Sequence, residues 1–341
     1  MSHKVHNLSL RLFQRYFEPI KYLTHNRTYK VLFLGSDSIA LKSLKNINEF
    51  RKSEQTITCL DVVSSNNTKN KTEVEKYALS ENIKIIKWPL QNIQTLQYDI
   101  GLIVAFGHLI KDDLLNKFPL GMVNVHPSLL PCWRGAAPII HTLLNGDQET
   151  GVTLMKIHAN IFDVGEIISQ KKISITKDVK LPELTDQLSS IGAEMLVECM
   201  RNLPEHLANA KPQSKDGITY ARKVSKSISV VRWDDMKAIE VYNLYRAIYG
   251  LYTLTTMFMD KQVKLFDAFL YDTDDIEHTD VPIGCLTYCP ITKSVKVLCK
   301  DRKYIYFRSL RILGKREITA LDFYNGYIKN MTVKSYKKDV V

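Results

Sequence analysis

The stretch Asn124-Val125-His126-Pro127-Ser128-Leu129-Leu130-Pro131 closes a short apolar run and places an amide and an imidazole two residues apart. A carboxyl group, Asp163 in Phe162-Asp163-Val164-Gly165, follows 37 residues after His126. An amide and an imidazole can donate hydrogen bonds to a developing oxyanion, and a carboxylate can take the proton that an attacking amine loses. The three side chains therefore predict acyl transfer that needs no covalent nucleophile and no metal. By itself, the Asn-x-His pair also suits a capped turn at the end of a strand.

Short apolar runs lie around this stretch and are separated by segments with helical periodicity. The runs predict strands at Lys30–Leu34, Thr56–Val63, Ile83–Trp88, Ile100–Ala105 and Met122–Val125. After the first run, Gly35-Ser36-Asp37-Ser38 offers a capping side chain for a helix that continues to about Phe50. This alternation favours a mostly parallel α/β sheet with crossover helices.

Asp163 lies between two further runs, Val152–His158 and Ile167–Ser174, which predict an antiparallel pair of strands. Asn124, His126 and Asp163 then fall in loops that leave strands, where sheets of this kind bind their ligands. The pattern Gly-x-Gly-x-x-Gly is absent from the chain, which argues against a dinucleotide site. The crevice at the carboxyl ends of the strands is therefore expected to bind another ligand.

The second half of the chain has a different pattern. Helical spacing recurs at Leu181, Leu184, Leu188, Ile191, Met195 and Cys199, which marks a core-facing helix. Residues 203–217, with Pro204 and Pro212, are the best linker candidate. A helix at Met236–Ala247 follows. Strands are expected near Leu254–Met259, Val263–Leu270, Gly284–Tyr288, Val295–Cys299 and Tyr304–Leu313. Five short strands and one helix suit a small barrel of the OB type.

Length and composition exclude several classes of protein. At 341 residues, the chain exceeds the size at which a single core keeps growing, so two domains are expected. No apolar stretch approaches the roughly 18 to 20 residues that a membrane span needs. The six cysteines show no pair of C-x-x-C motifs, and the pair Cys285 and Cys289 has no nearby histidine cluster to complete a zinc site. We expect reduced thiols in a reducing compartment.

The net charge of +11 is spread unevenly along the chain. Residues 1–28 carry +4, and residues 210–341 carry +8 from 23 basic and 15 acidic side chains, which leaves 29–209 nearly neutral. Within the second part, residues 281–341 hold 13 basic and 4 acidic side chains. Such a bias favours a polyanionic partner, because each neutralised phosphate releases condensed counterions. A solvated basic surface without a ligand is the alternative.

The first 28 residues differ from the rest in composition. Basic residues alternate with leucine and aromatic residues, and Glu18 is the only acid. This basic, amphipathic, acid-poor composition is typical of a mitochondrial targeting segment. A surface helix or a disordered tail is the alternative interpretation.

Motifs in Asn124–Pro131 and further along the chain resemble the folate-dependent formyltransferase family. The resemblance covers nearly the whole chain after residue 28. The similar segments are Asn124–Pro131, Trp133–Pro138, Asn145–Asp147, Glu149–Thr153, Tyr220–Lys223 with Trp233, Gly314–Arg316 and Ala320–Gly326. The segments after residue 217 narrow the resemblance to members that act on methionyl-tRNA, because other formyltransferases lack that region.

The resemblance implies a Rossmann-like catalytic domain at 29–202, a linker at 203–217 and a basic, OB-like, tRNA-binding domain at 218–341. It implies formyl transfer from 10-formyltetrahydrofolate to the α-amino group of initiator methionyl-tRNA, which gives N-formylmethionyl-tRNA for translation initiation. Together with the expected targeting segment at residues 1–28, the resemblance implies that the protein is located in the mitochondrial matrix. The formyl donor is already activated, so neither ATP nor a metal is implied. We expect a monomer with no membrane partner.

The family also implies roles for individual residues. Asn124 and His126 donate to the oxyanion, while Asp163 holds His126 or a water and accepts the amine proton. The expected folate-binding residues are Ser128, Leu129, Leu130, Pro131, Ala105, Phe106 and Gly107. The expected tRNA-binding residues are Arg134, Lys69, Lys71, Lys315 and Arg316.

The chain departs from the family at two places that concern the site. The usual Gly-Leu-Asp-Thr-Gly is replaced by Ile161-Phe162-Asp163-Val164-Gly165, and the loop Ser64–Lys71 is shorter than the basic loop of bacterial members and lacks arginine. Two other functions remain open. A formyltransferase or hydrolase for small molecules would keep the three site residues but would not need the basic domain. An inactive RNA-binding relative would not need an intact site.

Overall fold

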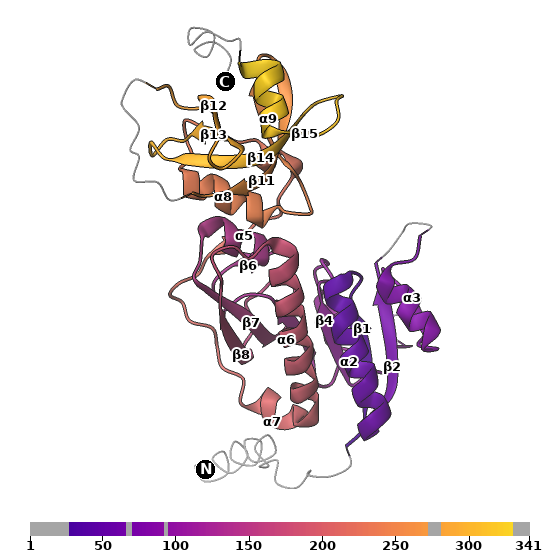
Figure 1. Cartoon of the computed structure of the whole chain (residues 1–341). Coiled ribbons are helices and arrows are strands. Elements are labelled where there is room, and N and C mark those ends of the chain that lie inside the picture. The colour runs from indigo at the N-terminus through magenta and orange to yellow at the C-terminus, as the bar shows by residue number, and fades with distance from the viewer. Residues whose placement is uncertain (1–26, 66–69, 92–94, 272–280, 330–341) are drawn as a thin grey trace, which may run out of the picture.

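The computed structural model describes residues 27–65, 70–91, 95–271 and 281–329, which form two domains joined end to end (Figure 1). Each domain has a sheet and a hydrophobic core of its own. Nearly all of the expected targeting segment, and Lys69, lie outside the described residues. No helix in the described part is both long and apolar enough to cross a membrane.

The first domain is built on a seven-stranded sheet with the order β3-β2-β1-β4-β5-β7-β8. Its strands are β1 (Tyr29–Leu34), β2 (Ile57–Ser64), β3 (Ile85–Lys87), β4 (Ile100–Val104), β5 (Met122–His126), β7 (Glu149–Lys156) and β8 (Ile167–Ser174). The five strands from β3 to β5 pair in parallel, whereas β7 pairs antiparallel with both β5 and β8. The predicted mostly parallel sheet and its antiparallel pair are confirmed.

Helices cover one face of this sheet, and α2 (Ser38–Glu54) and α6 (Leu181–Arg201) lie side by side over it (Figure 1). The same core includes apolar residues of α3 (Glu73–Ser80) and α5 (Pro138–Asn145). The short helix α4 (Asp112–Leu115) and the loop after β4 cover the other face. Alternate residues of β1 face the two cores, so the strand is buried on both sides, as central parallel strands are.

The segment predicted as a linker is largely folded. It begins with α7 (Leu203–Ala208), which has a proline in its first turn, where the missing N–H costs no hydrogen bond. Lys211 then exchanges two backbone hydrogen bonds with Ile167 of β8. Beyond it, β9 (Tyr220–Ala221) pairs in parallel with β6 (Arg134–Gly135). Residues 209–222, here called the connector, therefore run along the first domain before they enter the second.

The second domain is an antiparallel sheet with the order β10-β11-β14-β13-β12, and a short strand β15 also pairs with β14. Its elements are η2 (Lys226–Ser229), α8 (Ala238–Ala247), β10 (Leu254–Phe258), β11 (Lys261–Phe269), β12 (Leu286–Cys289), β13 (Ser294–Leu298), β14 (Tyr304–Ile312), β15 (Ile318–Thr319), α9 (Ala320–Phe323) and η3 (Tyr324–Ile328). All five expected strands are present. In the described residues the strand path is open between β10 and β12, as in a partly open barrel.

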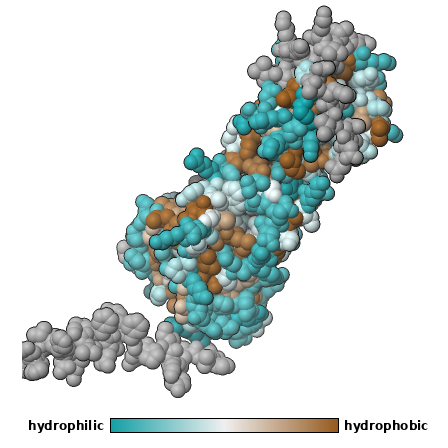
Figure 2. All heavy atoms as spheres, turned by 90° about the vertical axis from the view of Figure 1, so that its left-hand side faces the viewer, coloured by the Kyte–Doolittle hydropathy of each residue, from teal (hydrophilic) through white to brown (hydrophobic). Residues whose placement is uncertain are grey.

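The two domains meet where α5 packs against α8 (Figure 1). Arg246 is buried there with 4% of its surface exposed, and it donates to Asn243 Oδ1 at 3.0 Å and to the Val179 carbonyl at 3.4 Å. Burial lowers the pKa of Arg246. Tyr242 Oη donates to Asp178 Oδ1 at 2.7 Å. Figure 2 shows the result as one elongated molecule.

Candidate active site

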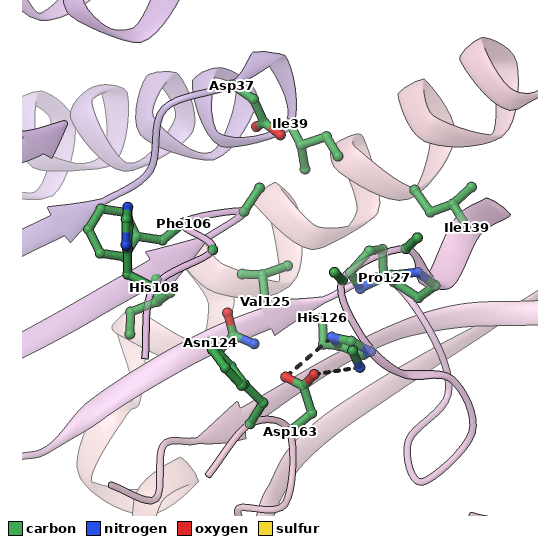
Figure 3. Close-up of a pocket in the computed structure, with 18 of the residues that line it drawn as sticks. Asp37, Ile39, Phe106, His108, Asn124, Val125, His126, Pro127, Ile139 and Asp163 are labelled. Carbon is green, nitrogen blue, oxygen red and sulfur yellow. Dashed lines mark hydrogen bonds and ion pairs between the residues drawn. The ribbon is translucent and has the colours of Figure 1, made fainter. Parts of the chain in front are cut away.

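A cavity of about 580 Å³ opens at the carboxyl ends of β1, β4 and β5, which are neighbours in the sheet. The chain order of the strands reverses between β1 and β4, and the crevice at such a switch is where open α/β sheets bind ligands. Loops after all three strands contribute walls. The residues that line the cavity at these strand ends and in the segments that follow them are Asp37, Ile39, Ala105 to Ile110 and Asn124 to Pro127 (Figure 3).

His126 ends β5 with 4% of its surface exposed, and its two ring nitrogens have different surroundings. Nε2 lies 2.9 Å from the carbonyl oxygen of Trp133, and a carbonyl only accepts, so Nε2 carries a proton. Nδ1 faces Asp163 Oδ1 at 3.6 Å. Nδ1 is therefore the ring nitrogen that points toward the Asp163 carboxylate. Trp133 is itself held by its indole N–H, which donates to Asp147 Oδ2 at 2.7 Å.

Asp163 reaches the cavity from the loop between β7 and β8, with 7% of its surface exposed. Its backbone has a φ of 57°, in the left-handed region that non-glycine residues rarely adopt. Oδ2 accepts a 2.8 Å hydrogen bond from the backbone N–H of Gly135, which leaves Oδ1 toward His126. At Gly165 a Cβ would lie 1.8 Å from the Lys156 carbonyl oxygen. The Asp-x-Gly spacing is thus required by the path of this loop.

Asn124 and His126 lie on the same face of β5, because side chains alternate along a strand. The amide of Asn124 points into the cavity and makes no hydrogen bond to any residue that the structure describes (Figure 3). A buried amide normally has a partner, so this one is available to a ligand. The structure brings Asn124, His126 and Asp163 to one wall of one cavity, and their catalytic roles stay a prediction.

The expected folate residues divide into two groups. Ala105, Phe106 and Gly107 line the cavity, on a loop that curls back with φ values of 49° at Ala105 and 72° at Gly107. Phe106 is fixed edge-on against Trp88, with 5.1 Å between ring centroids. The backbone N–H groups of Phe106 and Gly107 make no hydrogen bond within the described residues, so they too are available to a ligand.

The other group, Ser128, Leu129, Leu130 and Pro131, does not line the cavity. Ser128 is fully buried, and its Oγ donates to the Cys132 carbonyl at 2.6 Å. The backbone of Leu130 is tied to the side chains of Thr153 and Gln170. These residues hold the shape of the turn behind the cavity wall. Direct contact between these residues and a folate stays a prediction.

The expected tRNA residues lie in separate places. Arg134 is next to the site, where Nε and Nη2 donate to Gln213 Oε1 at 3.2 and 2.7 Å. Lys71 is exposed near the start of α3. Lys315 and Arg316 are exposed on the turn between β14 and β15, and Lys315 Nζ donates to Tyr327 Oη at 2.9 Å. The structure does not bring the five residues together as one surface.

The sequence did not lead us to predict several residues of the site. Gln213 donates from Nε2 to the carbonyls of Asp163 at 3.0 Å and Gly165 at 2.9 Å, although it lies 50 residues from Asp163. Ile161 and Phe162 line the cavity with 55% and 53% of their surfaces exposed. Their position beside Asp163 was a signal that could have been used, whereas nothing local to Gln213 indicates its contacts.

Asp37 at the far wall is both a cap and a cavity residue. Its side chain accepts from the backbone N–H of Ala40 at 2.9 Å and so caps α2. Burial raises the pKa of Asp37, and the backbone N–H groups at the start of α2 partly oppose that shift. In the described part of the chain, no group of three or more His, Cys, Asp or Glu side chains is arranged to hold a metal.

Comparison with protein-family models covers both domains. The model described as formyl transferase matches residues 29–200, and that described as formyl transferase, C-terminal domain, matches residues 223–328. The mitochondrial methionyl-tRNA formyltransferases of Rattus norvegicus and Homo sapiens are 39% and 38% identical over 309 residues, which is 88% of this chain and 79% and 78% of theirs. A methionyl-tRNA formyltransferase of Staphylococcus aureus is 32% identical over 68% of this chain and 73% of its own length.

Solved structures of similar fold are more distant in sequence. An N-formyltransferase from Helicobacter canadensis, in complex with folinic acid and dTDP-3-aminofucose, has a TM-score of 0.61 at 20% identity, over 82% of this chain and 98% of its own. HypX from Aquifex aeolicus, in complex with tetrahydrofolic acid, has a TM-score of 0.57 at 14% identity, over 89% of this chain and 48% of its own. These likenesses concern the fold.

Proposed function

Because this chain belongs to the formyl transferase family and matches both of its domain models, we propose that it formylates the α-amino group of methionyl-tRNA in mitochondria. The formyl donor is 10-formyltetrahydrofolate, and the product is N-formylmethionyl-tRNA for translation initiation. The observation that carries the proposal is the meeting of Asn124, His126 and Asp163 at one cavity, in a chain that also has the C-terminal domain.

The cavity suits a folate as the formyl donor. Ile103, Phe106 and Ile139 supply apolar walls for a planar ring system. Phe106 and Gly107 line the same space, and their unpartnered backbone N–H groups can bond the polar edge of such a ring. A mostly apolar pocket with a few fixed polar groups is the usual form of a cofactor-sized site.

The three polar side chains suit the transfer step. The amine nitrogen forms a bond to the formyl carbon, and the bond from that carbon to N10 of the folate breaks. Asn124 donates to the formyl oxygen as negative charge develops on it. His126, whose Nε2 is held by the Trp133 carbonyl and whose Nδ1 faces Asp163, is the second donor to that oxygen. Asp163 accepts the proton that the amine loses and returns that same proton to N10 as it leaves, so the carboxylate is restored at the end of the reaction.

The position of Asp163 also orients the aminoacyl group. The methionyl sulfur is four bonds from the amine nitrogen, so an amine that gives its proton to this carboxylate keeps the thioether within roughly 8 Å of it, given ordinary bond lengths. The exposed Ile161 and Phe162, which flank Asp163, can receive the thioether there. An apolar, polarizable thioether packs favourably on aliphatic and aromatic surface.

The second domain supplies a surface for tRNA phosphates. Its basic side chains lie over aromatic rings, with Lys296 Nζ 3.8 Å from the Tyr304 ring centre and the Arg308 guanidinium 4.5 Å from that of Phe269. Cations supported in this way keep their charge available to phosphate oxygens, which fix position without reading bases.

The test offers one formyl donor with several acceptors. Purified protein receives 10-formyltetrahydrofolate with methionyl-tRNA, with uncharged tRNA, with glycinamide ribonucleotide or with no acceptor, and transfer and hydrolysis are followed separately. Formylation of methionyl-tRNA alone is the expected result. Transfer to the small amine at a comparable rate, or hydrolysis that is independent of any acceptor, would overturn the proposal.

A further inference from the structure

The connector between the two domains forms the outer support of the site. It pairs with the loop that follows the Leu-Leu-Pro turn: Trp133 N donates to Thr219 Oγ1 at 2.8 Å, and Arg134 N donates to the Thr219 carbonyl at 2.9 Å. Ala137 N donates to the Ala221 carbonyl at 3.1 Å. At Gly135, with a φ of 123°, a Cβ would lie 2.6 Å from the Ala221 oxygen, so the two segments touch at backbone distance.

The supported loop is the one that orients two of the three site residues. The carbonyl of Trp133 accepts from His126 Nε2, and the N–H of Gly135 donates to Asp163 Oδ2. Both groups belong to residues adjacent to the connector contacts. A shift of the connector would therefore move the groups that set the ring orientation of His126 and the carboxylate of Asp163.

Gln213 of the connector joins the two sides of this arrangement. Its Nε2 donates to the carbonyls of Asp163 and Gly165, and its Oε1 accepts two N–H groups from Arg134, the residue before Gly135. One side chain thus joins the backbone of the acid to the guanidinium of the residue that precedes Gly135. Asp163 needs such a tie, because a left-handed backbone at a non-glycine residue persists only when its surroundings over-determine it.

We infer that the connector is part of the catalytic apparatus and that Gln213 is the positioning residue for Asp163. The inference rests on the proposed role of Asp163 in formyl transfer. It means that the segment entering the tRNA-binding domain also sets the geometry of the chemical step, so the two domains share more than a tether.

If Gln213 served only the stability of the fold, its substitution would have other consequences than the loss of geometry expected at Asp163. A second hollow, lined by Arg134, Val164, Gln213 and Ser214, is open to solvent on the outer side of the Asp163 loop. Water can therefore reach the carbonyls and the guanidinium when the Gln213 amide is removed, and the fold survives the change. The loss is one of geometry at Asp163, and a small misplacement of a reacting group costs up to about 100-fold in rate.

The experiment uses the full chain and three variants. Gln213→Ala removes all four hydrogen bonds, and Gln213→Glu keeps an acceptor for Arg134 but has no N–H for the loop carbonyls. Gln148→Ala is the matched control, because Gln148 is an exposed glutamine whose amide donates to the Gly146 carbonyl at 3.1 Å. We measure kcat, KM for both substrates, the melting temperature, and hydrogen exchange of the amides of 157–167.

Both Gln213 variants are expected to lower kcat by about 10- to 100-fold, with KM values within about twofold of wild type and an unchanged melting temperature. Exchange in 157–167 is expected to rise, while Gln148→Ala matches wild type in every measurement. Unchanged kcat, or a change confined to KM for methionyl-tRNA, would overturn the inference. If wild type does not formylate methionyl-tRNA, the proposed function fails, and the exchange measurement alone then decides: unaltered exchange in 157–167 rejects the positioning role.

Discussion

The cavity of the first domain and the basic surface of the second carry their charges in opposite ways. Asn124, His126 and Asp163 are each less than 10% exposed, and hydrogen bonds to backbone groups of Trp133 and Gly135 hold His126 and Asp163 in place. Lys315 and Arg316 are exposed on a turn. A transition state needs groups held in place in advance and shielded from water. Phosphates along a flexible polyanion need charges that can adjust, so exposure suits them.

The two domains also differ in how large an effect is expected when one polar or charged side chain is removed. A buried polar group that loses its partner pays the full cost of desolvation, whereas an exposed cation regains water when its partner leaves. Substitutions in the cavity or at the domain junction should therefore have large effects, whereas substitutions on the basic surface should have small effects that depend on salt.

The largest effect is expected for Asp163→Asn. The amide has nearly the same shape but cannot accept the amine proton, so kcat should fall by roughly 100-fold or more with little change in KM for either substrate. Steady-state formylation of methionyl-tRNA measures both quantities. Asp234→Asn, at an exposed turn, is the control. Near-normal turnover of Asp163→Asn would remove this acid from the mechanism.

The next largest effect is expected at the junction of the domains. Arg246→Ala leaves Asn243 Oδ1 and the Val179 carbonyl without their donor in a buried place, so the free energy of unfolding should fall by about 2–4 kcal/mol. Urea denaturation of the full chain measures it. Arg308→Ala, on the exposed sheet face, should stay within about 0.5 kcal/mol of wild type. Equal losses in the two variants would contradict the contrast between buried and exposed cations.

A smaller effect is expected for Lys315→Ala/Arg316→Ala. If both cations contact phosphates, KM for methionyl-tRNA rises several-fold, its salt slope falls by about one unit per lost contact, and folate binding is unchanged. Formylation rates at several tRNA and salt concentrations give these values. Lys84→Ala/Lys87→Ala removes two exposed charges from the first domain as a control. Equal slopes in wild type and the Lys315/Arg316 variant would shift attention to Lys69 and Lys71.

The smallest effect at neutral pH is expected for Tyr242→Phe. Burial and the hydrogen bond to Asp178 raise the pKa of Tyr242 to about 12, so the folded state retains its proton more tightly than the unfolded state does. The stability from this proton is complete below about pH 10 and is lost as the pH rises toward 12. Melting temperatures should therefore fall more steeply over that range in wild type than in Tyr242→Phe. Parallel curves would show that Tyr242 does not contribute.

The sequence by itself was sufficient for the framework of both domains and for the three central site residues. Buried strands such as β1 and β4 are continuous apolar runs, and their length and flanking residues identify them without tertiary information. Asn124, His126 and Asp163 could be named from the chemistry expected of acyl transfer and from the spacing of the motifs, and the structure brings them to one cavity. The connector was harder to predict, because Pro212 and the polar residues around it are equally typical of a free linker.

Only the tertiary structure decided which atoms of these residues meet. The proton on His126 Nε2 depends on the Trp133 carbonyl, Ser128 and Leu130 bond Cys132 and Thr153, and Gln213 reaches Asp163 across 50 residues of sequence. Hydrogen bonds between segments so far apart leave no periodicity and no local preference in the chain. They arise when the sheet brings the carboxyl ends of its strands to one edge and the connector returns along it, and that return path is a property of the folded chain as a whole.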